Sequence, residues 1–260
     1  MTTQDGTARG AANRWLHAFK ANPKAGVRLI CFPYAGGTAM VYRSWAQRLP
    51  AEVEVLAVQL PGRASRMQEP LYFDLPRLIE AMAPVLAPHL EAPFAFFGHS
   101  MGAMIAFELA RLLRREGRAG PLRLFVSGRS APQLNRTHAP LHDLPQPELL
   151  RELGRLNGTP REVLEHPELM ELMLPILRAD FSVCDTYEYR EEPPLDCPIT
   201  AFGGLQDAGV PRRNLEAWRE QTSGAFTLRM LPGDHFFLHS DESLLLRLLA
   251  TELHQLLAGR

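Results

Sequence analysis

The chain has 260 residues, with 28 Lys and Arg against 29 Asp and Glu, so its formal net charge is only −1. Such a balance provides no global electric field to attract nucleic acid or an anionic membrane surface, and those two classes of partner are therefore disfavoured. Hydrophobic residues make up 46% of the chain, which is enough for one domain with a sizeable core.

Residues 1–25 are expected to form a flexible arm ahead of a single domain over 26–260. The first part, Met1 to Arg14, is polar and has no apolar signal core, and no later segment is long and apolar enough to span a bilayer. We therefore expect a cytoplasmic protein. The three cysteines, Cys31, Cys184 and Cys197, lack paired ligand spacing, so we expect buried thiols and neither a disulfide framework nor a metal site.

The apolar run Val27–Phe32 predicts a buried strand that leads into the loop Pro33–Gly37. Glycines in this loop allow backbone amides to approach a substrate closely. We assign a candidate oxyanion donor to the N–H of Ala35 and, as the weaker choice, to that of Tyr34, which is also a candidate substrate-binding residue. A plain glycine turn is the alternative.

Two segments follow in which the ordinary structural explanation is favoured. Tyr42 and Trp45 stand at helical spacing, and we expect them to pack in the core rather than to contact a ligand. After a second predicted strand over Val53–Val58, a loop carries Arg63 and Arg66, for which a solvated surface is an adequate explanation.

The most informative segment is Gly98-His99-Ser100-Met101-Gly102. It follows the apolar run Phe94–Phe97 and precedes the helical pattern Met101–Arg114, as a nucleophile elbow requires. Both glycines are expected to be necessary because a Cβ there would collide with neighbouring backbone. The turn would present the Ser100 hydroxyl, and the N–H of Met101 would stabilise an oxyanion with help from the helix N-terminus.

An insertion of roughly seventy residues separates the predicted strand Leu122–Ser127 from the next one, and we place a helical lid at about 131–190. Its two apolar stripes consist of Leu149, Leu150, Leu153 and Leu156, and of Leu169, Leu172, Met173, Ile176 and Leu177. Packed over Ser100, the lid would form an apolar chamber lined by Met170 and Met173. Simple packing of these stripes on the body of the domain is the alternative.

A nucleophilic serine needs a histidine as base and a carboxylate that orients it, and both are expected after Ser100 in the chain. Asp207 follows the predicted strand Pro198–Phe202, and His235 follows the predicted strand Phe226–Leu231. We assign Asp207 as the acid and His235 as the base. Asp234 is the alternative acid, but adjacent side chains in an extended turn usually diverge.

The alternation of strands with amphipathic helices, such as Leu75–Leu90 and Glu242–Leu257, predicts an α/β fold. A mostly parallel central sheet would be covered by helices on both faces.

With these motifs in place, the chain resembles the type II thioesterases of polyketide synthase and nonribosomal peptide synthetase systems, within the α/β-hydrolases. The likeness extends from about Val27 to Leu238 and is carried by five segments, Cys31–Gly37, Gln59–Arg63, Phe97–Ala103, Leu195–Ile199 and Gly233–Phe237. It implies the same triad of Ser100, Asp207 and His235.

The resemblance implies a free-standing enzyme that hydrolyses acyl thioesters from the phosphopantetheine arm of acyl or peptidyl carrier proteins, clearing stalled chains from a synthase. No cofactor of its own is expected, and a monomer is expected. Two alternatives remain, a carboxylesterase or lipase for small free esters and a binding module without chemistry. Arg63, Arg66, Arg212 and Arg213 are candidates for meeting an acidic carrier surface.

Overall fold

The structure is a computed structural model, and it describes residues 14–134, 139–156 and 164–259. Their central feature is a seven-stranded sheet with the strand order β1-β3-β2-β4-β5-β6-β7. The strands are β1 (Leu16–Ala18), β2 (Val27–Phe32), β3 (Val53–Val58), β4 (Phe94–His99), β5 (Leu124–Ser127), β6 (Ile199–Gly204) and β7 (Phe226–Leu231). Only β1 pairs antiparallel, and every other pairing in this sheet is parallel.

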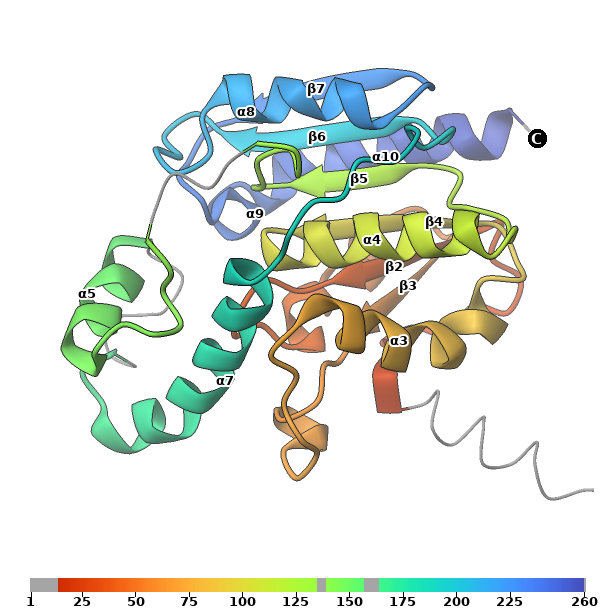
Figure 1. Ribbon diagram of the computed structural model, residues 1–260. Helices are drawn as coiled ribbons and strands as arrows, with labels where there is room; N and C mark the ends of the chain where they lie inside the picture. Colours follow the sequence, from red (N-terminus) through yellow and green to blue (C-terminus); the bar gives the residue numbers. More distant parts are fainter. Residues whose placement is uncertain (1–13, 135–138, 157–163, 260) are drawn as a thin grey trace, which may run out of the picture.

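Helices cover both faces of the sheet (Figure 1). On one face lie α3 (Leu75–Leu86), α4 (Met101–Arg115) and α8 (Arg212–Glu216), and on the other lie α2 (Trp45–Arg48), α9 (Phe237–Ser240) and α10 (Glu242–Ala258). Short 3₁₀ helices complete the body, η1 (Ala39–Tyr42), η2 (Ala64–Arg66), η3 (Ala87–His89) and η4 (Ala217–Gln221). The expected α/β fold with a mostly parallel sheet is confirmed.

Side chains alternate between the two cores because successive strand residues point to opposite faces. In β2, Ile30 and Phe32 join the core under α3 and α4, whereas Leu29 and Cys31 join the core under α10. Tyr42 and Trp45 are each at most 1% exposed in the second core, which confirms their packing role. The cysteines are free thiols, Cys31 and Cys197 buried and Cys184 half-buried.

The expected flexible arm over residues 1–25 is wrong in its second half. Residues 1–13 lie outside the described residues, but Leu16–Ala18 forms β1 and pairs with β3. Trp15 is buried and the Arg66 guanidinium stacks over its ring at 3.9 Å. A three-residue strand has too little periodicity to be visible in the sequence, and its partner strand decides its conformation.

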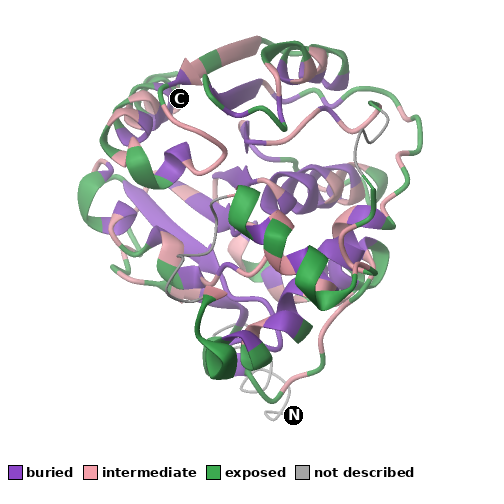
Figure 2. Ribbon diagram, turned by 90° about the vertical axis from the view of Figure 1, so that its left-hand side faces the viewer, coloured by how far each residue is buried: buried purple, intermediate pink, exposed green. Residues whose placement is uncertain are grey.

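Two helices from the predicted insertion, α5 (Gln146–Leu156) and α7 (Pro167–Asp185), lie beyond the ends of the central strands (Figure 1). Seen from that side, the helices nearest the viewer expose their outer turns, and the strands behind them are buried (Figure 2). Residues 135–138 and 157–163 of the insertion lie outside the described residues.

The predicted stripe on α5 is largely correct, because Leu149 and Leu153 are buried. On α7 two members of the predicted stripe are wrong, since Leu169 and Leu172 are 42% and 60% exposed, whereas Ile176 and Leu177 are buried as predicted. The lid core contains Leu177 of that stripe together with Met170, Leu174 and Phe181, and Met173 is partly buried beside them. The sequence of α7 is apolar on too many sides for periodicity to select one face.

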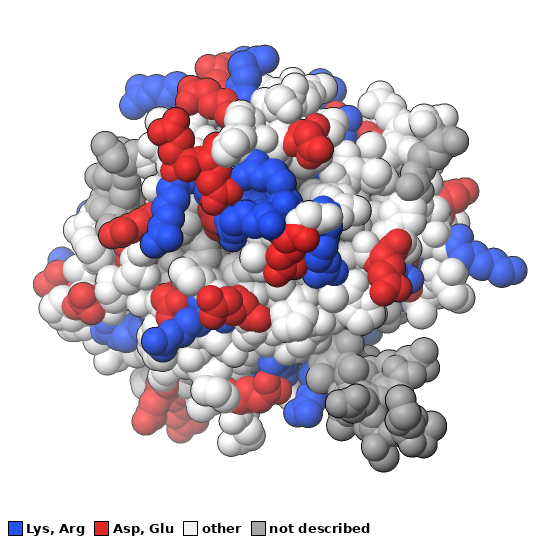
Figure 3. Space-filling model, turned by 45° about the vertical axis from the view of Figure 1, so that its right-hand side comes forward, with Lys and Arg blue, Asp and Glu red and all other residues white. Residues whose placement is uncertain are grey.

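Charged residues of both signs are interspersed over the face drawn in Figure 3, where a basic group near the centre is bordered by acidic side chains. This mixing agrees with the small net charge of the chain. Among the described residues, no helix is long and apolar enough to cross a membrane.

Candidate active site

Ser100 lies in a sharp turn between β4 and α4. Its φ of 53° and ψ of −113° fall in a region that side-chain-bearing residues rarely adopt. A Cβ on Gly98 would lie 2.1 Å from the carbonyl oxygen of Gly102, and a Cβ on Gly102 would lie 2.0 Å from that of Phe32. The requirement for both glycines of the elbow is therefore confirmed.

We expect Gly102→Ala to destabilise the fold, because the new methyl group would overlap the backbone oxygen at the end of β2, which a rotamer change cannot relieve. Overpacking of this kind typically costs about 1–3 kcal/mol or more. Urea unfolding would measure the loss. Gly120→Ala is the matched control, since a Cβ there meets no atom within 4 Å, and an equal loss for both variants would contradict the argument.

Asp207 and His235 lie on neighbouring loops, after β6 and β7 respectively, and meet in one hydrogen bond. His235 Nδ1 is 2.7 Å from Asp207 Oδ2, while Asp207 Oδ1 accepts the backbone N–H groups of Gly209 at 3.0 Å and Val210 at 3.1 Å. Both carboxylate oxygens are thus held, and the side chain of Asp207 is 4% exposed. A carboxylate fixed in this way selects the tautomer of His235 that carries its proton on Nδ1.

Asp234, the alternative acid, makes a local bond, since its Oδ1 accepts the N–H of Phe236 at 2.8 Å. The loop that carries Asp234 is tied to the loop after β6 by a hydrogen bond of 2.9 Å from the N–H of Gln206 to the carbonyl of Gly233. The structure therefore supports the assignment of Asp207 as the partner of His235. The sequence left this choice open, because only the register of β6 against β7 brings the two loops together.

His99 connects these loops to the elbow. It directly precedes Ser100, and its ring lies 5.2 Å from that of His235. Its Nδ1 is 2.9 Å from Ser127 Oγ, and aromatic contacts to Phe236 and Phe237 complete its surroundings. Burial, with the nearby His235 as a further cause, holds the pKa of His99 well below its usual range, so this imidazole is a neutral packing platform beneath His235.

The loop after β2 reaches the same place. In the β2–β4 pairing, Phe32 stands opposite Gly98, which brings the following residues of each strand to one edge of the sheet. Met101 is the first residue of α4, and such N-terminal amides have no acceptor within their own helix. No hydrogen bond from the N–H of Ala35 is found among the described residues. Both candidate oxyanion donors therefore lie on segments that flank Ser100.

Tyr34 has a partner that the sequence did not suggest. Its hydroxyl lies 2.9 Å from His239 Nε2, and its ring packs edge-on against Phe236 and His99. Burial lowers the pKa of His239. No local signal in the sequence distinguishes His239.

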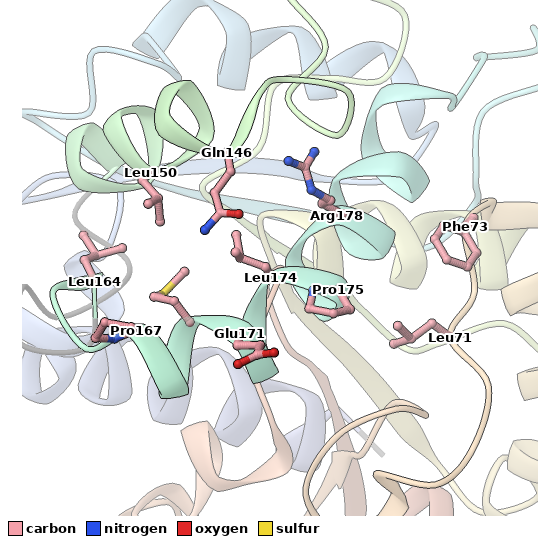
Figure 4. A pocket seen from close by; sticks show the side chains of 11 residues that line it. Leu71, Phe73, Gln146, Leu150, Leu164, Pro167, Glu171, Leu174, Pro175 and Arg178 are labelled. Carbon is pink, nitrogen blue, oxygen red and sulfur yellow. The ribbon is translucent and has the colours of Figure 1, made fainter.

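A cavity of about 820 Å³ lies between the lid helices and the loop before α3. Figure 4 shows the apolar side chains around it, with Leu150 from α5, Leu174 from α7 and Phe73 from the loop. Met170 belongs to its lining, whereas Met173 packs in the adjacent lid core. The three triad residues are not among the lining residues that the described part of the chain provides.

The two arginines expected at a solvated surface are buried, each 3% exposed, and that prediction is wrong. Arg66 donates to the carbonyl of Gln59 at 2.8 Å, and Arg63 forms a two-pronged ion pair with Asp180 of α7 at 2.5 and 2.7 Å. The partner of Arg63 is 117 residues away, so no local pattern could reveal this pair. Arg212 and Arg213 remain exposed.

No group of three or more His, Cys, Asp or Glu side chains suited to a metal ion is found in the described ranges.

Comparison with known proteins agrees with this geometry. The model of the thioesterase domain family matches residues 27–253. The chain is 48% identical to the linear gramicidin dehydrogenase LgrE of Brevibacillus parabrevis over 95% of each chain, and 46% identical to the gramicidin S biosynthesis protein GrsT of Aneurinibacillus migulanus over 95% of this chain and 97% of that protein. The solved structure of the type II thioesterase BorB from the borrelidin biosynthetic cluster superimposes with a TM-score of 0.84 at 41% identity, covering 92% of this chain and 97% of that one.

The name of LgrE denotes a dehydrogenase. Its similarity to this chain nevertheless covers the region that matches the thioesterase domain family.

Proposed function

The chain belongs to the thioesterase domain family, and from that membership we propose that it hydrolyses acyl thioesters carried on the phosphopantetheine arm of acyl or peptidyl carrier proteins. Relatives named for gramicidin S and borrelidin biosynthesis support a place in nonribosomal peptide or polyketide assembly. The main support for this chemistry is the hydrogen bond between Asp207 and His235. The ring of His235 lies beside that of His99, the residue that directly precedes Ser100.

In the proposed mechanism, Ser100 Oγ attacks the thioester carbonyl while His235 Nε2 takes the hydroxyl proton. The carbonyl oxygen becomes an oxyanion, which the N–H groups of Ala35 and Met101 stabilise together with the N-terminal dipole of α4. The C–S bond then breaks, and the thiolate leaves with the proton from His235, so that an acyl-enzyme and a free carrier thiol remain.

Water completes the cycle. His235 removes a proton from a water molecule that attacks the acyl-enzyme. The second tetrahedral intermediate then collapses as His235 returns that proton to Ser100 Oγ, which leaves the carboxylic acid and free Ser100. Each step uses only side chains and backbone amides of this chain, so the proposal includes no cofactor. Asp207 remains ionised throughout and stabilises the positively charged imidazole.

The apolar cavity between α5, α7 and the loop before α3 would take the acyl chain. Most of its lining residues are apolar, with Gln146, Glu171 and Arg178 as the polar ones, and the thioether of Met170 adapts to different shapes. We therefore propose a broad acyl specificity, which suits the removal of stalled or aberrant chains from a synthase. The enzyme would act as a monomer in the cytoplasm.

The experiment that tests this function compares leaving groups at matched acyl length. A panel of acylated carrier proteins is expected to be hydrolysed with a higher kcat/KM than the p-nitrophenyl esters of the same acids. Equal or lower values for the carriers would contradict the proposal and favour a carboxylesterase for small free esters. Absence of any labelling of Ser100 by a fluorophosphonate would instead indicate a binding protein without chemistry.

A further inference from the structure

A buried ion pair joins the lid helix α7 to the loop that carries the candidate oxyanion donor. Asp180 on α7 and Arg63 after β3 are each 3% exposed. Arg63 Nη1 lies 2.5 Å from Asp180 Oδ2, and Nη2 lies 2.7 Å from Oδ1. Two parallel bonds of this kind fix the direction of the carboxylate as well as its position.

The fixed carboxylate holds the oxyanion loop directly. Asp180 Oδ2 accepts the backbone N–H of Gly36 at 2.7 Å, and Arg63 Nη1 also donates to the carbonyl of Gly37 at 3.4 Å. Leu177, one turn earlier on α7, packs on the same residue, since a Cβ on Gly36 would lie 2.8 Å from its Cδ2. Gly36 has a φ of +78°, which strains any other residue. Helix α7 therefore contacts the loop in two ways, through the carboxylate of Asp180 and through the apolar side chain of Leu177.

These contacts determine where the N–H of Ala35 points. The carbonyl of Tyr34 accepts the N–H of Gly37 at 2.9 Å, and in a trans peptide the N–H points opposite to the carbonyl. The N–H of Ala35 therefore points away from the inside of this turn. The peptide group between Ala35 and Gly36 is also fixed, because its N–H, on Gly36, donates to Asp180. The orientation of the Ala35 N–H is therefore held on both sides.

We propose that Asp180, held by Arg63, is a positioning residue for the oxyanion hole, and that the alignment of the Ala35 donor depends on the place of α7. This inference rests on the acyl-transfer mechanism proposed above. Helix α7 also supplies Met170 and Leu174 to the wall of the cavity, so one helix contributes to both the acyl chamber and the oxyanion loop.

The test is the variant Asp180→Asn, assayed with a p-nitrophenyl ester and with an acylated carrier. The NH₂ group of asparagine is a donor and cannot accept from the Arg63 guanidinium, so the two-pronged pairing that orients the side chain toward Gly36 is lost. A donor displaced by about 1 Å costs on the order of 10- to 100-fold in rate, so we expect that loss in kcat with KM little changed. The affinity for a trifluoromethyl ketone, whose adduct with Ser100 carries an oxyanion, is expected to fall by the same factor as kcat/KM.

Glu252→Gln is the matched control. Glu252 is 7% exposed in its side chain and pairs with Arg123 at 2.6 Å, away from the elbow, so its loss tests the effect of breaking a buried ion pair as such. We expect it to lower stability in urea and to leave kcat and the affinity for the ketone unchanged. Wild-type kcat and ketone affinity in Asp180→Asn would overturn the inference, as would an equal loss of both in Glu252→Gln.

If Asp180→Asn does not fold, hydrogen exchange in the wild-type protein decides the matter. The amide of Gly36 is expected to be strongly protected and that of Ala35 to exchange faster, and an unprotected Gly36 would overturn the inference. The two substrates separate the proposals. A wild-type enzyme that hydrolyses the ester but no acyl carrier disproves the proposed function, whereas the response of ester hydrolysis to Asp180→Asn still tests the oxyanion loop.

Discussion

Replacement of Ser100 by alanine is expected to reduce kcat for thioester hydrolysis by about 10⁴- to 10⁶-fold, the range seen when the nucleophile of a triad is removed. Without the hydroxyl, no acyl-enzyme can form, and His235 has no nucleophile to activate. The rate of thiol release from an acylated carrier would measure the loss, and mass spectrometry would follow fluorophosphonate labelling, which should disappear.

Ser100→Gly provides the control for folding. Both variants lack the hydroxyl, but Ser100 has a φ of 53°, and glycine adopts such a backbone conformation without strain. We expect both variants to be inactive, with the glycine variant more stable than the alanine variant by about 1 kcal/mol in urea unfolding. Activity above about 1% of wild type in either variant would contradict the role of Ser100 as nucleophile.

Asp207→Asn is expected to reduce kcat by about 10⁴-fold while preserving the fold, as when the orienting acid of a triad becomes an amide. The backbone N–H groups of Gly209 and Val210 donate to one oxygen of Asp207, and the amide oxygen of asparagine would keep that place. Its NH₂ group would then face His235 Nδ1 as a donor. The imidazole would respond by carrying its proton on Nε2, where it could no longer accept the proton of Ser100.

Asp234→Asn is the matched control, because it removes the neighbouring carboxylate that is the alternative acid. The amide oxygen of asparagine can still accept the N–H of Phe236, so the turn is kept. We expect this variant to retain most of the wild-type kcat. A loss in Asp234→Asn as large as that in Asp207→Asn would contradict the assignment of the acid, and NMR of the His235 ring protons would report the tautomer in each protein.

The parts of the fold with strong local patterns could be predicted from the sequence alone. The runs over β2, β3, β4 and β7 are apolar or alternate, and α3 and α4 have a clear amphipathic period, so these elements lie within a few residues of the expected bounds. The elbow could be predicted for a different reason. Its two glycines are required by backbone overlaps that would occur in any strand-to-helix turn this sharp.

The errors share one physical cause, namely that the deciding contact lies far away in the chain. Arg63 lies in a polar loop and is expected at the surface. It is buried because it pairs with Asp180, which is 117 residues away in the chain. Part of the stripe on α7 was misjudged because burial there depends on other elements. Met170 packs against residues of α5 in the lid core, whereas Leu172 has no such partner among the described residues and is exposed. The short strand β1 exists because β3 offers it hydrogen-bonding groups.

By itself the sequence determined the order of the main strands and helices, the elbow at Ser100, and an acid and a histidine on loops after late strands, since these depend on local spacing and backbone sterics. Only the tertiary structure decided that Asp207 reaches His235, that His99 lies uncharged beside it, and that Asp180 holds the loop after β2. Hydrogen bonds between distant segments depend on strand register and helix packing, and both are set by the burial of the whole core rather than by any one segment.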